Sequence, residues 1–199
     1  MTAPASQLAA DQQAHFEALY AASSDPWNVK GAWYEQRKRT LLLACLHQER
    51  YASAFEPGCG NGELTAALAE RCERILACDG AASAIAAARA RIFQYPGAVA
   101  EQRHLPQDWP EGDAAFDLIV VSEMAYYLPA LVWQDLVARI VASLAPGGLL
   151  LMCHCRYPYD DYATSADFVH GAAGARPELT SRVHYAEPDF LLDGWLRAA

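Results

Sequence analysis

The sequence predicts an α/β protein with a doubly wound, mostly parallel sheet. From Tyr51 onward, short apolar segments alternate with segments of helical periodicity, and a glycine-rich turn at residues 58–62 follows the first of them. The last two apolar segments are separated by a turn around Pro188, which is typical of an antiparallel hairpin. Near-continuous apolar strands separated by helices indicate a parallel sheet that helices cover on both faces.

Two helices are expected ahead of the sheet. Residues 6–22 place apolar side chains, Phe16 among them, at helical spacing. The S-S-D-P-W segment at residues 23–27 ends this helix, and residues 32–46 form the second one. The sheet does not require either helix, so we treat residues 1–48 as a separate N-terminal helical region.

The core of the expected domain covers residues 51–199. Its strands are expected at 51–56, 74–79, 97–103, 116–122 and 148–155, with helices at 63–72, 81–93 and 129–144. A hairpin of residues 182–187 and 189–197 at the sheet edge brings the number of strands to seven. Ligands of such sheets bind outside the carboxyl ends of the strands, where the strand order reverses.

Composition limits the classes of function. A chain of 199 residues suits one domain, residues 1–199, and a hydrophobic fraction of 53% excludes a disordered chain. The net charge is −9 and no basic run is longer than residues 37–39, which argues against a nucleic-acid partner. No stretch reaches the roughly 20 apolar residues of a membrane-spanning helix, and residues 1–4 lack the basic start of a signal peptide. We therefore expect a small-molecule substrate and no membrane.

The six cysteines also bear on location. None of them forms a C-x-x-C pair, and they lie within apolar strands or helices. This pattern is typical of buried thiols in a reducing compartment, so we expect a cytoplasmic protein.

The glycine turn and an acid on the next strand carry most of the functional information. Glycines 58, 60 and 62 permit backbone conformations that a Cβ disfavours and allow a ligand to approach the main chain. Asp79 ends the second strand, where a carboxylate can accept both hydroxyls of a ribose. Asp79 can alternatively cap the helix at 81–93, although Gly80 beside it favours close approach of a ligand. Together these features predict a nucleoside cofactor.

The spacing of the glycines narrows the cofactor. A dinucleotide fingerprint requires G-x-G-x-x-G, but the third position counted from Gly58 is Glu63. An acidic side chain at a helix N-terminus opposes a pyrophosphate there. A nicotinamide-dependent dehydrogenase is therefore the least favoured class.

These motifs resemble those of a known superfamily. The segment E-P-G-C-G-N-G at residues 56–62 is similar to the first motif of class I S-adenosylmethionine-dependent methyltransferases, and Asp79 is similar to their ribose-binding acid. Within them, the chain resembles the NodS-like group over residues 15–197. The matching segments are D-P-W at 25–27, W-Y-E-Q-R-K at 33–38, F-E-P-G-C at 55–59, S-E-M-A-Y-Y at 122–127 and F-L-L-D-G-W at 190–195.

The resemblance implies a Rossmann-like methyltransferase fold with S-adenosyl-L-methionine as cofactor. In the family, the acid at Glu56 contacts the amino acid part of the cofactor. Many members carry an acid that binds adenine where this chain has His104 and Leu105, so main-chain groups or Leu105 can serve instead, and His104 can equally be an ordinary loop residue. The cofactor-binding residues that we expect are Trp27, Arg37, Glu56, Gly58, Cys59, Gly60, Asn61, Gly62, Asp79, Gly80, His104, Leu105, Ser122 and Glu123.

The acceptor is expected at the ends of the fourth and fifth strands. Glu123 follows the fourth strand and can position an amine or take its proton, with Tyr127 beside it. Tyr126 or Tyr127 can instead pack under the following helix. His154, near the end of the fifth strand, has an ordinary pKa near neutrality and is a candidate general base, although a structural histidine is as well supported. The expected catalytic residues are Glu123, His154 and Tyr127.

Two further sequence features bear on metal binding and on a lid. C-H-C at 153–155 is not a metal site on a strand, because its middle residue points away from the other two, and we expect no metal. The aromatic segments at 25–27 and 33–37 can form a lid over cofactor and acceptor, with Arg37 pairing with the cofactor carboxylate. They can alternatively only cover an edge of the sheet.

The reaction expected from the resemblance is N-methylation of an amino sugar or a related amine. An O-methyltransferase acting on a small hydroxylated metabolite stays open, although oxygen acceptors need a stronger base or a metal. A non-catalytic cofactor-binding module stays open as well. The oligomeric state is expected to be a monomer or a homodimer.

Overall fold

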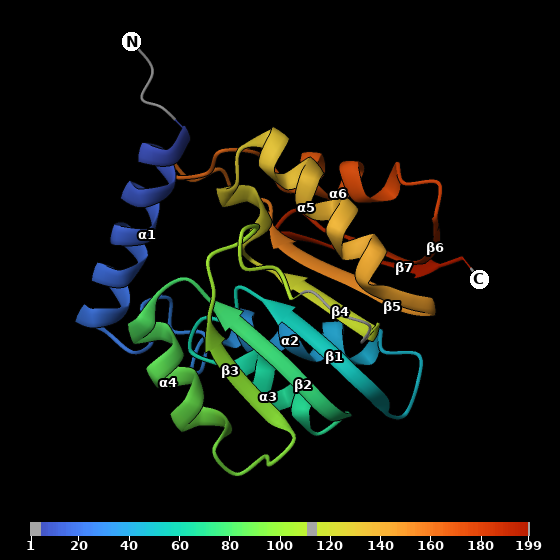
Figure 1. Cartoon of the computed structure of the whole chain (residues 1–199), viewed down its shortest axis with the longest axis horizontal. Coiled ribbons are helices and arrows are strands. Elements are labelled where there is room, and N and C mark those ends of the chain that lie inside the picture. Colours follow the sequence, from blue (N-terminus) through green and yellow to red (C-terminus); the bar gives the residue numbers. More distant parts are fainter. Residues whose placement is uncertain (1–4, 111–114, 199) are drawn as a thin grey trace.

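The computed structural model describes residues 5–110 and 115–198, and side chains from residue 11 onward. Within these residues a seven-stranded sheet has the order β3-β2-β1-β4-β5-β7-β6 (Figure 1). The strands are β1 (Tyr51–Pro57), β2 (Cys72–Asp79), β3 (Ala98–Gln102), β4 (Phe116–Ser122), β5 (Leu144–Cys155), β6 (Leu179–Ala186) and β7 (Phe190–Arg197). The helices are α1 (Ala5–Ala22), α2 (Trp33–Ala44), α3 (Glu63–Ala69), α4 (Ala82–Ile92), α5 (Ala130–Ser143) and α6 (Ala166–Gly174), with a 3₁₀ turn η1 at Ala125–Tyr127.

The predicted fold class is confirmed. Strands β1 to β5 pair in parallel, and β7 pairs antiparallel with both β5 and β6, as the hairpin predicts. Helix α6 and the η1 turn were not predicted. Helix α6 is short, and glycines at both 171 and 174 weaken its helical pattern. The division into one domain over 1–199 stays a prediction, and residues 1–4, 111–114 and 199 lie outside the described part.

Helices cover both faces of the sheet because successive strand side chains point to opposite faces. On one face, Leu150 and Met152 of β5 belong to a core cluster with Trp133 of α5 and Val169 of α6. On the other, Leu149 and Leu151 pack in a cluster with Leu42 of α2 and Leu68 of α3, and α4 continues this layer over β2 and β3. The two-sided burial explains the nearly continuous apolar strand sequences.

The strand order reverses between β1 and β4, whose neighbours β2 and β5 lie on opposite sides. The carboxyl ends of these parallel strands meet at one edge of the sheet, and α1 stands beyond that edge (Figure 1). Helix α1 contacts α4. The fold therefore places the glycine turn, Asp79 and the residues after β4 under α1. Within the described residues, no helix has the length and apolar character needed to cross a membrane.

Gly62 has a packing role in this arrangement. It is the N-cap of α3 with φ of 81°, a left-handed conformation that side chains disfavour. A Cβ added there meets the Cα of Ala88 at 2.9 Å, so Gly62 allows α3 and α4 to approach closely. Gly62 does not line the cavity described below. Helix packing and backbone conformation therefore account for this glycine, and its place in the cofactor-binding set stays a prediction.

This packing can be tested with two glycine substitutions. We expect Gly62→Ala to lower the free energy of unfolding by about 2 kcal/mol, from the left-handed conformation and the contact with the Ala88 backbone. The control, Gly171→Ala on α6, has no atom within 4 Å of its added Cβ and should raise the free energy of unfolding by about 0.5–1 kcal/mol. Equilibrium urea unfolding measures both, and unchanged stability of Gly62→Ala would contradict the packing role.

Candidate functional site

A cavity of about 1700 Å³ opens at the carboxyl ends of β1, β2, β4 and β5. Helix α1 contributes Phe16 and Tyr20 to its lining. The volume exceeds the roughly 300–1,000 Å³ of common ligand pockets, so it has room for two ligands side by side. The predicted site residues that line it are Trp27, Glu56, Gly58, Cys59, Gly60, Asn61, Asp79, Gly80, His104, Leu105, Ser122, Glu123 and Tyr127.

The glycine turn is fixed to the end of β2. The backbone N–H groups of Gly58 and Cys59 donate to the carbonyl oxygen of Cys78 at 2.7 and 2.9 Å. Gly58 has φ of 72°, and a Cβ there meets the Cβ of Met124 at 2.6 Å. A side chain is therefore excluded both by conformation and by Met124, and Gly58 lines the cavity.

Asp79 lies beside this turn. Its Oδ2 accepts the Gly60 N–H at 3.1 Å and its Oδ1 accepts the Ala81 N–H at 2.9 Å. Burial raises the pKa of this carboxyl, and the backbone donors oppose that rise. The N-cap of α4 is Ala81, without a side-chain cap, so the structure does not support the capping alternative for Asp79. Its carboxylate instead fixes the segment that leads into α4, and Asp79 lines the cavity.

Glu56 is the least satisfied polar group of the site. It is 2% exposed, it lines the cavity, and its Oε2 is buried without a hydrogen-bond partner. Burial raises its pKa to about 8. An unpartnered buried carboxylate oxygen is costly unless a donor reaches it. The site is therefore complementary to a cationic group placed against Glu56.

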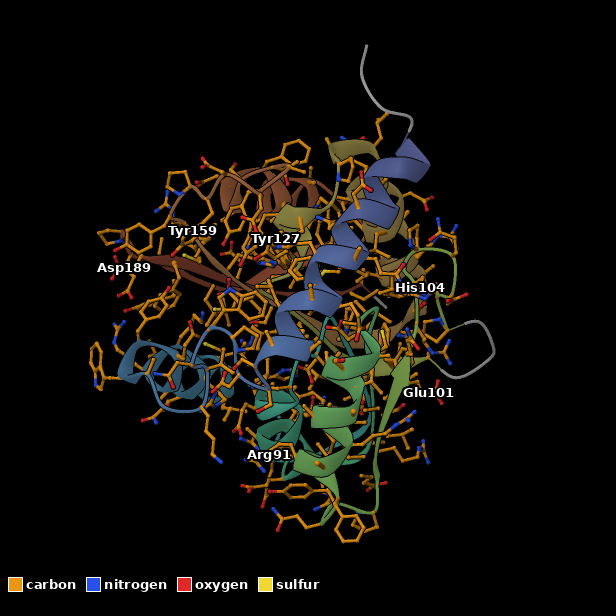
Figure 2. All side chains as sticks on the ribbon, turned by 90° about the vertical axis from the view of Figure 1, so that its left-hand side faces the viewer. Arg91, Glu101, His104, Tyr127, Tyr159 and Asp189 are labelled. Carbon is orange, nitrogen blue, oxygen red and sulfur yellow. The ribbon has the colours of Figure 1, made fainter. Side chains whose placement is uncertain are left out.

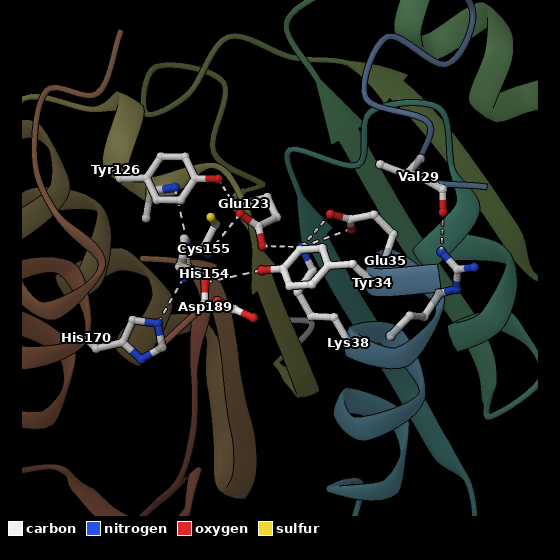
Figure 3. Close-up of polar contacts among 12 residues, drawn as sticks. Val29, Tyr34, Glu35, Lys38, Glu123, Tyr126, His154, Cys155, His170 and Asp189 are labelled. Atoms are coloured by element: carbon white, nitrogen blue, oxygen red, sulfur yellow. Dashed lines mark hydrogen bonds and ion pairs between the residues drawn. The ribbon is translucent and has the colours of Figure 1, made fainter. Parts of the chain in front are cut away.

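On the other side of the cavity, Glu123 is held by several donors (Figure 3). Its Oε1 pairs with Lys38 Nζ at 2.6 Å, and its Oε2 accepts the Cys155 N–H at 3.1 Å and the hydroxyl of Tyr126. Glu123 has φ of 57°, an uncommon conformation for a side chain other than glycine. Its oxygens are engaged in wall contacts, so it is poorly placed to be the free proton acceptor that the sequence suggested.

Lys38 is the partner that sequence reasoning missed. It is 4% exposed and pairs with Glu35 as well as Glu123. Burial opposes its charge, but these two carboxylates raise the pKa of Lys38 above its ordinary value. Tyr34, Lys38 and Leu42 are spaced four residues apart and so share one face of α2. That spacing could have shown that Lys38 faces inward.

Arg37 was assigned to the wrong partner. Its guanidinium binds the Glu187 carboxylate at 2.5 and 2.9 Å and lies outside the residues that line the cavity. The cause is helical geometry, because Arg37 is about 100° around α2 from Lys38 and faces the β6–β7 turn. Arg39, which donates to the Val29 carbonyl oxygen at 3.2 Å, lines the cavity instead.

His154 does not face the acceptor side either. It is fully buried, does not line the cavity, and burial together with His170 and Lys38 lowers its pKa well below the ordinary value. On β5 it points to the α5/α6 face, whereas Cys155 points to the opposite face and lines the cavity. The structure therefore does not bring His154 to the cavity as the predicted general base requires, and the strand alternation is the reason.

Tyrosines 126, 127, 159 and 162 line the cavity near Glu123 and form what we call the acceptor-side wall, since the acceptor is expected there; Figure 2 labels Tyr127 and Tyr159. The ring of Tyr126 stacks on Tyr162 at 3.8 Å between centroids, and Tyr127 meets Tyr162 edge-on at 5.1 Å. Tyr127 also packs against Phe16 of α1 at 4.8 Å, and its carbonyl oxygen accepts Gln12 Nε2 at 2.8 Å. Burial raises the pKa of Tyr127, so its hydroxyl stays neutral and can donate. These contacts connect the cavity wall to α1.

The segment after β3 supplies a further part of the lining. The His104 N–H donates to Asp108 Oδ2 at 2.9 Å, so Asp108 is engaged within its own loop. Leu105 lines the cavity next to His104 and offers an apolar surface there. Among residues 5–110 and 115–198, no group of three or more His, Cys, Asp or Glu side chains is arranged to hold a metal ion.

The sheet order, the glycine turn after β1 and the acid that ends β2 define the Rossmann-like fold of S-adenosylmethionine-dependent methyltransferases. The sequence profile of Nodulation protein S (NodS) matches residues 11–175, and the chain belongs to this family. Nodulation protein S of Rhizobium tropici is 34% identical over 137 residues, which are 68% of this chain. The match spans 57% of that relative, less than two thirds of its length.

Solved structures agree with this assignment. N-methyltransferase NodS from Bradyrhizobium japonicum WM9, in complex with S-adenosyl-L-homocysteine, superposes with a TM-score of 0.83 at 25% identity. That match covers 93% of this chain and 97% of the other. A crystal structure from Pseudomonas syringae described as a candidate methyltransferase is 44% identical, with a TM-score of 0.74, covering 83% of this chain and 100% of that one.

The state of Glu56 predicts a pH dependence of stability. Its pKa of about 8 lies above the ordinary value of 4.5, so the folded protein binds more protons than the unfolded chain between these pH values. Stability from this group therefore falls as pH rises from about 5 to about 8. We expect the free energy of unfolding of the parent, relative to Glu56→Gln, to decrease by a few kcal/mol over that window. Urea unfolding of both proteins at pH 5 and 8.5 measures it; a constant difference would show that Glu56 is not desolvated.

Proposed function

We propose that this chain is a methyltransferase that uses S-adenosyl-L-methionine to methylate an amine on a small-molecule acceptor. The observation that carries the proposal is the unpartnered, buried Oε2 of Glu56, which lines the cavity beside the glycine turn. The cofactor's amino group is a cationic hydrogen-bond donor, and Glu56 Oε2 has no such partner. Family membership and the fold support the cofactor, and the similar solved protein is itself described as an N-methyltransferase.

The described residues fit this cofactor. Glu56 would bind its ammonium group, and the chain of its amino acid part would lie along Gly58 and Gly60, which line the cavity. Asp79 would accept the ribose hydroxyls, and the His104–Leu105 segment would contact the adenine. Arg39, rather than Arg37, is the cation that would face the cofactor carboxylate, because only Arg39 of the two lines the cavity.

In the proposed reaction, the cofactor would supply a sulfonium methyl group: the lone pair of the acceptor nitrogen would form the N–CH3 bond as the S–CH3 bond breaks, and S-adenosyl-L-homocysteine would leave. The chain's own contribution is alignment of the two molecules and exclusion of water. Tyr126 and Tyr127 provide the acceptor-side wall, and Glu123 anchors Tyr126. Trp27 packs against Phe16 and Tyr20 of α1, so this N-terminal region would close the cavity as a lid.

Proton transfer favours nitrogen over oxygen acceptors. Glu123 is paired with Lys38, and His154 lies on the other face of β5, so neither is a free strong base. Asp161 lines the cavity and is exposed, and it can accept the proton of an ammonium acceptor. An alcohol needs a far stronger base than a carboxylate, whereas an amine does not.

We also propose a cytoplasmic location and a monomer or homodimer as the working state. All six cysteines are free thiols, and five of them are buried, which suits a reducing compartment. The net charge of −9 suits a small acceptor better than a nucleic acid.

The cofactor assignment predicts the effect of Asp79→Asn. Hydrogen bonds from hydroxyls to a carboxylate contribute about 1.5–3 kcal/mol each, so losing the charge should weaken S-adenosyl-L-homocysteine binding by about a hundredfold or more. Isothermal titration calorimetry measures the affinity. The control Asp167→Asn, at an exposed acid of α6, should bind as the parent does. If Asp79→Asn binds S-adenosyl-L-homocysteine as tightly as the parent does, Asp79 is not the ribose-binding acid.

The acceptor class can be tested with matched pairs of sugars. We expect methyl transfer from radiolabelled cofactor to primary amines of amino sugars, and none to the same sugars with a hydroxyl in place of the amine. Mass spectrometry locates the added methyl group. Methylation on oxygen would identify an O-methyltransferase, and tight cofactor binding without turnover of any acceptor would support a binding module instead.

A further inference from the structure

A chain of buried polar side chains runs through the α5/α6 side of the sheet, outside the cavity. His154 Nδ1 contacts His170 Nε2 at 3.0 Å, and His170 Nδ1 contacts Asp193 Oδ2 at 2.7 Å. Asp193 Oδ1 contacts Nδ1 of His184 at 2.6 Å, and the His184 side chain is 68% exposed. His154, His170 and Asp193 are all buried and none lines the cavity. We call His154, His170, Asp193 and His184 the histidine relay.

The register of the sheet builds the relay. Asp193 of β7 stands opposite His184 of β6 and Met152 of β5, and His154 is two residues after Met152 on the same face. Helix α6 crosses this face and adds His170. Four successive elements, β5, α6, β6 and β7, thus contribute one side chain each.

The hydrogen bond at the His154 end of the relay fixes the direction in which its members donate hydrogen bonds. His154 Nε2 accepts the backbone N–H of Ala125 at 3.3 Å. A backbone N–H can only donate, so His154 carries its proton on Nδ1 and donates it to His170 Nε2. His170 must then carry its own proton on Nδ1 and donate it to the Asp193 carboxylate. Although burial acts against it, the hydrogen bonds from His170 and His184 lower the pKa of Asp193 and keep this acceptor charged.

The relay ends at the acceptor-side wall. Ala125 is the first residue of η1, and the next two residues are Tyr126 and Tyr127, which line the cavity. The His154 ring also meets the ring of Tyr126 edge-on at 5.2 Å between centroids (Figure 3). Tyr126 is therefore held at two places. Its hydroxyl donates to Glu123, while His154 contacts its ring and accepts the backbone N–H of the preceding residue, Ala125.

Buried polar chains are costly unless every member is satisfied, and apolar side chains would fill this layer as well. We infer that His154, His170 and Asp193 are positioning residues, which set the placement of Tyr126 and Tyr127 for the methyl acceptor without touching it. The kinetic part of this inference rests on the proposed function. Its structural part, the proton on Nδ1 of both buried histidines, does not.

The variants separate a positioning role from simple core packing. His170→Phe keeps a ring but breaks the relay, and should lower kcat/KM for the acceptor about tenfold while the S-adenosyl-L-homocysteine Kd stays within about twofold. Asp193→Leu should behave likewise. Asp193→Asn keeps an oxygen for the His170 donor and should restore most of the activity. The control His47→Phe changes a histidine before β1, beside Tyr51 and away from the cavity, and should match the parent.

Nitrogen-15 NMR of the imidazoles tests the relay without turnover. In the parent, His154 and His170 should both show the tautomer protonated at Nδ1, and the Tyr126 ring resonances should move in His170→Phe but not in His47→Phe. Protonation of His154 at Nε2, or unmoved Tyr126 resonances, would overturn the inference. If the parent turns over no acceptor, the proposed function fails, and these spectra still decide the relay. Unchanged kcat/KM in an active His170→Phe protein would also overturn it.

Discussion

The two hydrogen bonds from the Gly58 and Cys59 amides to the Cys78 carbonyl oxygen organise the proposed cofactor side. They exist because β1 and β2 run parallel and end at the same edge of the sheet. They bring the glycine turn against Asp79, whose carboxylate then takes the Gly60 amide. Glu56, which precedes this turn, is buried at the cavity, and its Oε2 makes no hydrogen bond. The binding chemistry that we propose thus follows from one strand pairing and from glycines that keep side chains out.

The acceptor side depends on a different kind of constraint. Glu123 adopts a left-handed backbone conformation, and its carboxylate is held by Lys38, Tyr126 and the Cys155 amide. Strained positions persist where surrounding contacts determine them strongly, and such positions often occur at functional sites. This network neutralises an acid that would otherwise be a candidate base. It therefore assigns Glu123 to holding the wall rather than to proton transfer.

Much of the fold was accessible from the sequence because local and global patterns agree. The strand and helix alternation, the hairpin around Pro188 and the glycine turn each reflect residues close together in the chain. Helix α6 was missed because its glycines at 171 and 174 weaken the helical pattern, and packing on α5 and on the strands β5, β6 and β7 stabilises it. Within the candidate site, most residues near the glycine turn and the strand ends line the cavity, whereas Arg37, Gly62 and His154 do not.

The sequence by itself determined the fold class, the family resemblance and the positions at the strand ends, because these depend on periodicity and on short motifs. The tertiary structure decided which way the neighbouring side chains point and what they meet. Arg37 and Lys38 are adjacent, yet one binds the hairpin turn and the other enters the cavity wall. His154 and Cys155 likewise face opposite layers. Partners such as Glu187 and His170 are far away in sequence, so only the packed sheet and helices could assign them.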